Sequence, residues 1–454
     1  MDDGPRPRAP DRSSASERGA GTPLLANRPF VLYAAHYGIS SLGFWAFFLA
    51  ILAQATYRYH ATSVQIAIML AVWSLMFLIV VAPAGMVTDR WSPKRMILLA
   101  QVLAVASAVV ALAGGSIWAL YVASVIDAVG AAMAIPARGS LTALLVELEE
   151  LVRANGALNT VAMVALIVGP GAAGLIARHG SQAAVYWVIA GMLIAGAIPL
   201  FWVPDRRPER HERSSPVREV AEGFRFAWRE LELRSLLFLA CAIWVTLTVF
   251  VALEPLFVKQ VLGRGEDGLG LFWSTNGVGS FVGALALTRS RKAAGHEVLL
   301  IGVALILSGL GFLAFSGTSL LWVAIAGNVV MGVGFGGFLT LSQALIQRVA
   351  AEDLRGRVTG VMGMLQESSS VACSVAIALL GGLVLVRPSL VVAAAALTAS
   401  GLYGLRADRR IRRGAAARPT AHPVGRRAPP ALAAMPVPPT GPITPPVRRS
   451  DLDG

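Results

Sequence analysis

The sequence consists of long apolar runs separated by short clusters of charged residues. A run of about 20 residues, at 1.5 Å per residue in a helix, crosses a hydrocarbon layer of about 30 Å. Such runs are expected to be helical, because lipid offers no partner to an unpaired backbone amide. The pattern predicts twelve spanning helices at residues 30–53, 64–86, 96–114, 117–138, 156–177, 183–203, 235–258, 269–288, 298–316, 319–345, 358–384 and 388–406.

The composition agrees with a membrane protein. Of the 454 residues, 56% are hydrophobic and only 14% are charged, against roughly 25% charged in a soluble domain. The two cysteines, Cys241 and Cys373, both fall within predicted spans, so we expect packing residues and not a disulfide framework or a metal site. The predicted fold class is an all-α membrane protein with twelve transmembrane helices in two pseudo-symmetric six-helix bundles.

The distribution of basic residues predicts the orientation. An even number of spans puts both termini on one side of the membrane, and all but five of the 39 Lys and Arg residues lie on that side. The positive-inside rule makes it the cytoplasmic side, so we expect a multi-pass protein of the plasma (inner) membrane with cytoplasmic termini. This bias also accounts for the net charge of +13 without a nucleic-acid partner.

The chain divides into five segments by composition. We expect a disordered cytoplasmic N-terminal tail and a disordered cytoplasmic C-terminal tail rich in Pro and Arg, because neither has enough apolar residues to fold. Two six-helix bundles and a charged cytoplasmic linker, partly helical, lie between the tails. The boundaries are 1–28 for the first tail, 29–203 for the first bundle, 204–234 for the linker, 235–406 for the second bundle and 407–454 for the second tail.

The two bundles carry similar signals at equivalent loops. GMVTDR begins at Gly85 after the second span, and a degenerate counterpart, GALALTR, begins at Gly283 after the eighth. Matching signals at equivalent loops indicate a duplicated six-helix unit. Two such units around a central site are the plan of a secondary transporter.

The loop between spans 2 and 3 resembles the signature of the major facilitator superfamily. Its pattern is Gly85-x-x-x-Asp89-Arg90-x-x-x-Lys94-Arg95, and the resemblance covers roughly residues 28 to 406. More narrowly, ARGSLTALLVE, ELVRANGALN, IVGPGAAGLIARHG and EDLRGRV, in that order, resemble the branch of enterobactin-type siderophore exporters and macrolide efflux proteins.

The resemblance implies a gating role for this motif. Asp89 would meet the positive N-terminal end of span 11, near Arg357, while Gly85 would let backbones approach closely. Arg90 and the two following basic residues, Lys94 and Arg95, would tie neighbouring helix ends together while the inside is shut. The alternative interpretation is that the basic residues are only topology signals.

Span 5 carries a second motif of the family. Its GPxxGG pattern is present as Gly169-Pro170-Gly171-Ala172-Ala173-Gly174, with Ala173 in place of a glycine. In the family this span packs where the two halves meet and is associated with export. Ordinary helix packing by Gly169, Pro170 and Gly174 is the alternative.

Three carboxylates lie within predicted spans, where ionisable groups are costly and hence functional candidates. Asp127 is halfway along span 4, Glu254 is near the outer end of span 7, and Glu367 is about ten residues into span 11. Each is a candidate to bind a proton or the substrate. Asp127 has a structural hydrogen-bonding role as its alternative, and for Glu254 the alternative is a carboxylate at the rim that pairs with Lys259 or with water. Arg138 follows Asp127 by about 16 Å along the helix, too far for an intrahelical pair.

Aromatic and polar residues on the presumed cavity helices suit amphipathic, often cationic compounds. The same residue types also pack in cores and anchor helices at the interface, which is the alternative. These cavity candidates are His36, Tyr37, Trp45, Trp244, Asn328 and Gln343.

The sequence therefore predicts a secondary active transporter, with proton-coupled efflux of a drug, macrolide or siderophore by alternating access. The alternatives are proton-coupled uptake of a metabolite and a non-transporting membrane scaffold or sensor. An ATP-driven pump is not expected, because the sequence has no G-x-x-x-x-G-K-[ST] loop. An enzyme is not expected either, because no metal-ligand cluster or exposed nucleophile with a partner base is visible in the sequence. We expect no cofactor and no metal, the proton motive force as energy source, a small molecule, protons and the lipid bilayer as partners, and a monomer.

Overall fold

A computed structural model describes residues 24–88, 91–207, 216–289 and 295–417. These residues are almost entirely helical, and none of them is in a strand. Contacts group residues 1–409 into one compact unit and 410–454 into a second. Most of the N-terminal tail and the end of the C-terminal tail lie outside the described residues, as does the middle of the linker, so the predicted disorder of 1–23 and 418–454 stays a prediction. The tail predicted at 1–28 is ordered at its end, where Leu24–Ala26 form a 3-10 helix and α2 begins at Arg28.

Twelve long helices in the described residues correspond to the twelve predicted spans. The first six are α2 (Arg28–Ala53), α3 (Ser63–Thr88), α4 (Pro93–Ala113), α5 (Ile117–Leu145), α6 (Leu151–His179) and α7 (Gln182–Leu200). The last six are α9 (Leu231–Gln260), α10 (Glu266–Thr288), α11 (Glu297–Gly317), α12 (Leu321–Val349), α13 (Glu352–Leu380) and α14 (Val386–Ala417). We call these two groups the first half and the second half. Helix α8 (Pro216–Arg229) lies in the linker.

Eleven helices of the described residues are long and apolar enough to cross a membrane, and α10 is the exception. It is 23 residues long, or about 35 Å, but carries Ser274, Thr275 and Asn276 in its middle. Neighbouring helices satisfy these polar groups. Ser274 donates to the Ile167 carbonyl of α6 at 2.6 Å, and Asn276 donates to Asn328 of α12. We therefore interpret α10 as a spanning helix whose polar residues face the neighbouring helices, while Leu271, Val278 and Val282 are exposed on its other face.

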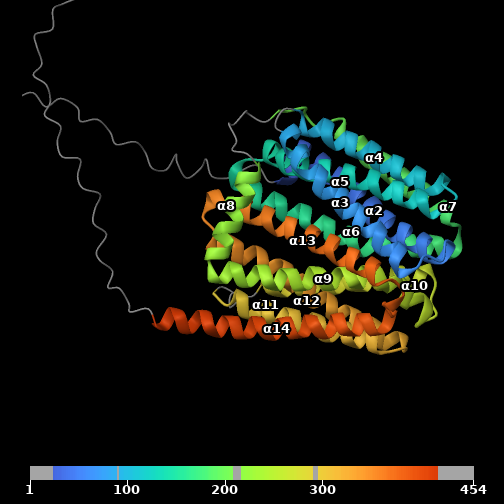
Figure 1. The fold of residues 1–454 in the computed structure, drawn as a ribbon. Coiled ribbons are helices and arrows are strands. Elements are labelled where there is room, and N and C mark those ends of the chain that lie inside the picture. Colours follow the sequence, from blue (N-terminus) through green and yellow to red (C-terminus); the bar gives the residue numbers. More distant parts are fainter. Residues whose placement is uncertain (1–23, 89–90, 208–215, 290–294, 418–454) are drawn as a thin grey trace, which may run out of the picture. The chain divides into compact units, whose positions relative to one another are not determined.

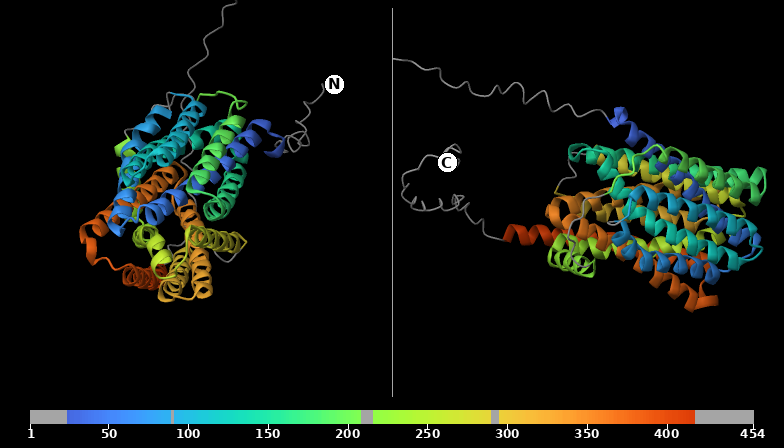
Figure 2. Two further views of the ribbon diagram at one scale, coloured as in Figure 1. Left: turned by 90° about the vertical axis from the view of Figure 1, so that its right-hand side faces the viewer. Right: turned by 90° about the horizontal axis from the view of Figure 1, so that it is seen from above.

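The helices lie side by side with alternating direction (Figures 1 and 2). Figure 1 shows α4, α5 and α7 opposite α11, α12 and α14, with α6 and α13 between them. We call the end of the bundle that holds α8 the linker end, and the other the distal end. Exposed tryptophans lie near both ends, as in the aromatic belts of membrane proteins: Trp91, Trp202 and Trp228 at the linker end, and Trp118, Trp187 and Trp322 at the distal end.

Two hydrophobic clusters show how the halves meet. The larger one combines residues of both halves, among them Leu49 and Ala173 of the first and Phe257 and Phe272 of the second. The smaller one, at the linker end, includes Tyr33 and Met96, and its buried members all belong to the first half. The halves are thus packed together toward the distal end.

Several predicted boundaries differ from the structure: α5 ends at Leu145 and not at 138, α6 begins at Leu151 and not at 156, and α13 begins at Glu352 and not at 358. Helix α14 continues to Ala417, past the predicted end of the second bundle at 406, and α9 begins at Leu231 and not at 235. Hydropathy marks where a helix leaves the hydrocarbon, not where its hydrogen bonds end. The sequence RADRRIRR after Leu405 is polar but consists mostly of good helix formers.

Candidate functional site

Helix α6 makes close contacts with both halves through its small residues. A methyl group on Gly169 would lie 2.9 Å from the Leu42 carbonyl oxygen of α2, and one on Gly174 would lie 2.9 Å from the Glu266 carbonyl oxygen of α10. A methyl group on Gly270 of α10 would in turn lie 2.7 Å from the Pro170 carbonyl oxygen. The span 5 motif therefore lies where the halves meet, as the resemblance implied.

Polar contacts join the halves at the distal end. The Tyr57 hydroxyl donates to the carbonyl oxygens of Arg264 and Gly265 at 2.9 and 3.1 Å. Arg178 forms an ion pair with Asp267 at 2.9 Å. Among the described residues, the hydrogen bonds and ion pairs between α2–α7 and α9–α14 lie at this end or midway along the helices. The structure is closed at the distal end.

Glu254 lies in this closed junction. Its side chain is 0% exposed, and neither carboxyl oxygen has a hydrogen-bond partner in the described residues. The Trp273 indole lies beside the carboxyl, but its nitrogen does not meet the geometry of a hydrogen bond either. Lys259, the alternative partner expected from the sequence, donates instead to the Thr56 carbonyl at 2.6 Å. Of the alternatives to a proton-binding role, the pair of Glu254 with Lys259 is therefore wrong.

An aromatic cluster from both halves covers Trp273. The Trp273 ring of α10 lies 6.1 Å from Trp45 and 5.2 Å from Phe48, both of α2, between ring centroids. Phe44 packs edge-on against Trp45 at 5.4 Å. The predicted cavity residue Trp45 is therefore part of the junction that buries Glu254. These faces offer π surface to a cation or an aromatic compound when the halves separate.

Glu367 lies midway along α13, also where the halves meet. It is 8% exposed and accepts a hydrogen bond from Gln366 at 3.2 Å. One turn further, Ser370 accepts a hydrogen bond from Ser74 of α3 at 3.0 Å. This pair of serines crosses from the first half to the second. Glu254 and Glu367 are thus both interfacial carboxylates.

Asp127 lies elsewhere, inside the first half. Its carboxyl accepts a hydrogen bond from the Trp73 indole at 2.9 Å and borders a cavity of about 180 Å³ among α2, α3, α4, α5 and α7. Phe44, Gln101 and Arg138 line the same cavity. The cavity therefore presents one acid, one base and aromatic faces, although Asp127 and Arg138 are too far apart along α5 to pair directly.

Two further candidates support the helices around this cavity. His36 is fully buried, and its Nδ1 lies 2.8 Å from the Gly196 carbonyl oxygen of α7. The Arg138 guanidinium lies 5.1 Å from the centroid of the Tyr37 ring, a cation–π contact. His36 holds α2 against α7, and Tyr37 orients Arg138.

The remaining three cavity candidates lie in the second half. Trp244 packs against Phe335 and Phe338 of α12 at 5.9 and 6.3 Å between centroids. Asn328 is fully buried and donates to the Phe272 carbonyl and to Thr275, which joins α12 to α10. Gln343 is exposed. The contacts of Trp244 and Asn328 connect helices in this conformation, and the predicted role of all three residues in the cavity stays a prediction.

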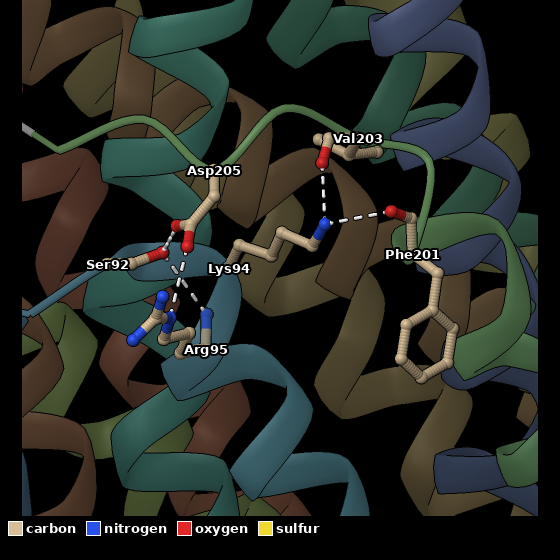
Figure 3. A network of polar contacts seen from close by, with 6 residues as sticks. All are labelled: Ser92, Lys94, Arg95, Phe201, Val203 and Asp205. Carbon is tan, nitrogen blue, oxygen red and sulfur yellow. Dashed lines mark hydrogen bonds and ion pairs between the residues drawn. The ribbon is translucent and has the colours of Figure 1, made fainter.

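The gating motif is only partly described, because Asp89 and Arg90 lie outside the described residues. Ser92 caps α4 by accepting from the Arg95 amide, and Pro93 occupies the first turn. This positions Lys94, which donates to the carbonyls of Phe201 and Val203 at 2.9 and 2.7 Å (Figure 3). The motif's described bases thus attach α4 to the chain that follows α7.

Asp205 completes this network. Ser92 donates to its carboxyl, and Arg95 forms an ion pair with it at 3.0 Å (Figure 3). The hydrogen bond from Ser92, with the ion pair from Arg95, holds the pKa of Asp205 below its usual range. Gly85 does not make the close backbone contact expected of it, since a methyl group there would meet nothing within 4 Å. The linker end is open around Gly85, which explains the difference.

Sequence analysis did not identify the residues that contact Asp127, Glu254 and Arg95 in the folded protein. Trp73, Trp273 and Asp205 lie on helices or loops distant in sequence from Asp127, Glu254 and Arg95, so no spacing could reveal the pairs. A tryptophan in the middle of a span, away from the interfacial belts, was the one available signal for Trp73.

These observations define a membrane protein of two six-helix halves that meet at one end. The profile of the Major Facilitator Superfamily matches residues 34–374. The chain belongs to this family of transporters, and it is not an enzyme.

Relatives at low identity include efflux proteins. The chain is 24% identical to the uncharacterized MFS-type transporter YfiS of Bacillus subtilis, over 75% of this chain and 84% of that one. It is 26% identical to the enterobactin exporter EntS of Escherichia coli, over 66% and 72%. It is 29% identical to the multidrug efflux pump Tap of Mycobacterium tuberculosis, over 46% of this chain and about half (51%) of Tap.

The fold is also that of solved transporters. A bacterial homolog to the human lysosomal transporter Spinster, in an inward-facing and unoccupied conformation, superposes with a TM-score of 0.67 at 14% identity. The match covers 85% of this chain and 98% of that structure. Such a likeness supports the fold alone.

Proposed function

We propose that the protein exports a small amphipathic compound across the plasma membrane in exchange for protons. The observation that carries the proposal is Glu254, a carboxyl that is fully buried where the two halves close on each other and that has no hydrogen-bond partner of regular geometry among the described residues. The relatives EntS and Tap, named as exporters, support efflux. Drugs, macrolides and siderophores are the compound classes to test.

The orientation follows from the basic residues. The linker end carries most Lys and Arg residues, so we assign it to the cytoplasm, with both termini there. The structure then represents a state that is closed to the outside. In this state the compound enters from the cytoplasm between the halves.

The proton enters the cycle at Glu254. Burying an ionised carboxylate without a partner is costly, so the distal end closes only when Glu254 is neutral. Closure from the outward-open state therefore takes up one proton from outside. When the compound is bound, that proton leaves toward the cytoplasm, with Glu367 as the second interfacial carboxyl on its route, and the ionised Glu254 that remains destabilises the closed distal end. The next opening of the distal end releases the compound outside.

The direct test is accumulation of amphipathic dyes, macrolides and siderophores in cells that express the protein, with and without a protonophore. Export predicts lower accumulation of at least one compound, and the protonophore should abolish the difference. Higher accumulation in expressing cells would indicate uptake instead. Equal accumulation across the panel, in cells with verified expression, would contradict a transport role for these compounds.

A further inference from the structure

Helix α8 carries a row of exposed aromatic rings. Phe224 and Trp228 are 48% and 45% exposed and four residues apart, so they lie on one helix face. Their rings stack with centroids 5.7 Å apart and an interplanar angle of 22°. Trp228 in turn contacts Phe238 of α9 at 5.7 Å, and Phe238 contacts Tyr403 of α14 at 6.4 Å. The row thus continues from α8 onto two spanning helices.

This continuity indicates what covers the aromatic row. Phe238 and Tyr403 are 49% and 42% exposed on helices whose outer surfaces contact lipid. An aromatic row that begins on such helices and ends on α8 lies at the boundary between hydrocarbon and headgroups. Trp228 is also one of the exposed tryptophans of the linker end, where belts of this residue mark the membrane interface.

Arginines accompany the aromatic residues. Arg225 and Arg229 each follow an aromatic residue by one position, and both are exposed. In the described part of the chain, neither forms an ion pair. A helix with aromatic residues on one face and unpaired arginines beside them matches the pattern of helices that lie in the membrane surface. The charges are complementary to anionic lipid headgroups.

Helix α8 is also attached to a helix at the interface between the halves. The Arg357 guanidinium of α13 forms an ion pair with the Glu222 carboxylate of α8 at 2.6 Å. A methyl group on Gly223 would lie 2.8 Å from the Arg357 carbonyl oxygen, so the two backbones are in close contact. Helix α13 carries Glu367 and Ser370 further along. A ligand that restrains the position of α8 therefore also restrains the linker end of α13 through these contacts.

We propose that α8 is a docking surface for anionic phospholipid. Headgroup phosphates bind Arg225 and Arg229, while Phe224 and Trp228 insert between the headgroups and the acyl chains. Through Glu222 and Arg357, the bound lipid holds the linker end of α13 in the position seen here. This inference requires that the chain spans a membrane, but not that it exports a compound or binds protons.

The test is hydrogen–deuterium exchange of the full chain in vesicles. Vesicles of equal parts phosphatidylglycerol and phosphatidylcholine are compared with vesicles of phosphatidylcholine alone. We expect the amides of 220–229 and of the first turns of α13 to exchange several-fold more slowly in the anionic vesicles. Inorganic phosphate added to the neutral vesicles should give no protection. Protection by phosphate alone would overturn the assignment to lipid.

Variants identify the residues responsible. Arg225→Gln/Arg229→Gln should remove the protection, whereas the matched control Arg207→Gln/Arg289→Gln, which removes two exposed arginines elsewhere at the linker end, should retain it. Glu222→Gln should keep the protection of α8 and lose that of α13. Equal exchange of the wild type in both vesicles, or equal loss of protection in the control, would overturn the proposal.

Discussion

Glu254 of α9 and Trp273 of α10 lie beside each other at the junction of the two halves, and neither the carboxyl oxygens nor the indole nitrogen has a hydrogen-bond partner in the described residues. Trp273 also packs against Trp45 and Phe48 of the other half. The same contact surface therefore buries the carboxyl and holds the halves together. A change in the charge of Glu254 and a change in the closure of the distal end are physically linked.

The first prediction concerns stability. Glu254→Gln should change the free energy of unfolding by no more than about 1 kcal/mol, because the amide replaces a neutral carboxyl of the same shape that has no partner to lose. Thermal unfolding of the purified protein measures this. A loss of several kcal/mol would indicate that Glu254 is charged and paired, which would contradict its assigned state. Glu149→Gln, at an exposed position of the linker end, is the control.

The second prediction concerns distal closure. Gly174→Val places side-chain atoms against the backbone of Glu266 and Asp267, and such overpacking costs about 1–3 kcal/mol. The cost applies only to the closed junction, so the distal-open state should gain about tenfold or more in population. In a Thr56→Cys/Cys241→Ser/Cys373→Ser background, where position 56 is buried in the closed junction, the thiol should then react faster with an impermeant thiol reagent.

The control for this experiment is Gly191→Val, since a methyl group on Gly191 meets nothing within 4 Å. It should leave the labelling rate unchanged. A rate for Gly174→Val equal to that of the control would show that the α6–α10 contact does not limit opening.

The third prediction concerns pH. The pKa of Asp205 is lowered in the folded protein by the hydrogen bond from Ser92 and the ion pair with Arg95. A lowered pKa adds stability above the unfolded value of about 4, and this stability is lost as pH falls through the folded pKa. Asp205→Asn should therefore destabilise the protein at neutral pH, by at most about 1 kcal/mol because the pair is partly exposed and screened.

Thermal unfolding midpoints of wild type and Asp205→Asn across the acid range measure this effect. The two curves should converge at low pH, where the wild-type carboxyl is protonated. A difference that persists unchanged at low pH would mean that shape, and not charge, is what Asp205 contributes to the α4–α7 contact.

The fourth prediction concerns the cavity beside Asp127. Asp127→Asn should weaken binding of cationic aromatic dyes by about tenfold, the value of one charge-assisted contact of about 1.4 kcal/mol. Neutral compounds should bind as before. Fluorescence polarisation of a cationic dye measures the dissociation constant. Equal loss for neutral and cationic compounds would identify Asp127 as a structural partner of Trp73 only, and Trp73→Phe should then give the same defect.

The spanning helices were predictable because lipid enforces apolar runs of a fixed length. Even α10 (Glu266–Thr288), whose hydropathy is lower, was predicted as a span at residues 269–288, because only a short polar stretch interrupts its apolar run. The structure shows that a neighbouring helix satisfies a polar residue of that stretch, Ser274. Helix ends were less predictable. α14 continues beyond the hydrocarbon because its arginine-rich end still favours helix.

The candidate site was predictable in part. Glu254 was predicted as a functional intramembrane carboxyl, and the pair with Lys259, given as an alternative, is not present in the structure. Lys259 follows by five residues, which at 3.6 residues per turn places it about 140° around the helix, outside the i,i+4 range. The true neighbours of Glu254 and Asp127 are tryptophans on other helices, and only the packing of the helices shows them.

The measurement that tests the central claim most directly is proton flux in proteoliposomes that contain an exported compound identified by the accumulation assay. An outward gradient of the compound should drive proton movement in the opposite direction in the wild type and in the Glu149→Gln control. Glu254→Gln should abolish this coupled flux while the protein stays folded. Coupled flux that persists in Glu254→Gln would contradict the account and would assign the proton-binding role to Glu367 or Asp127 instead.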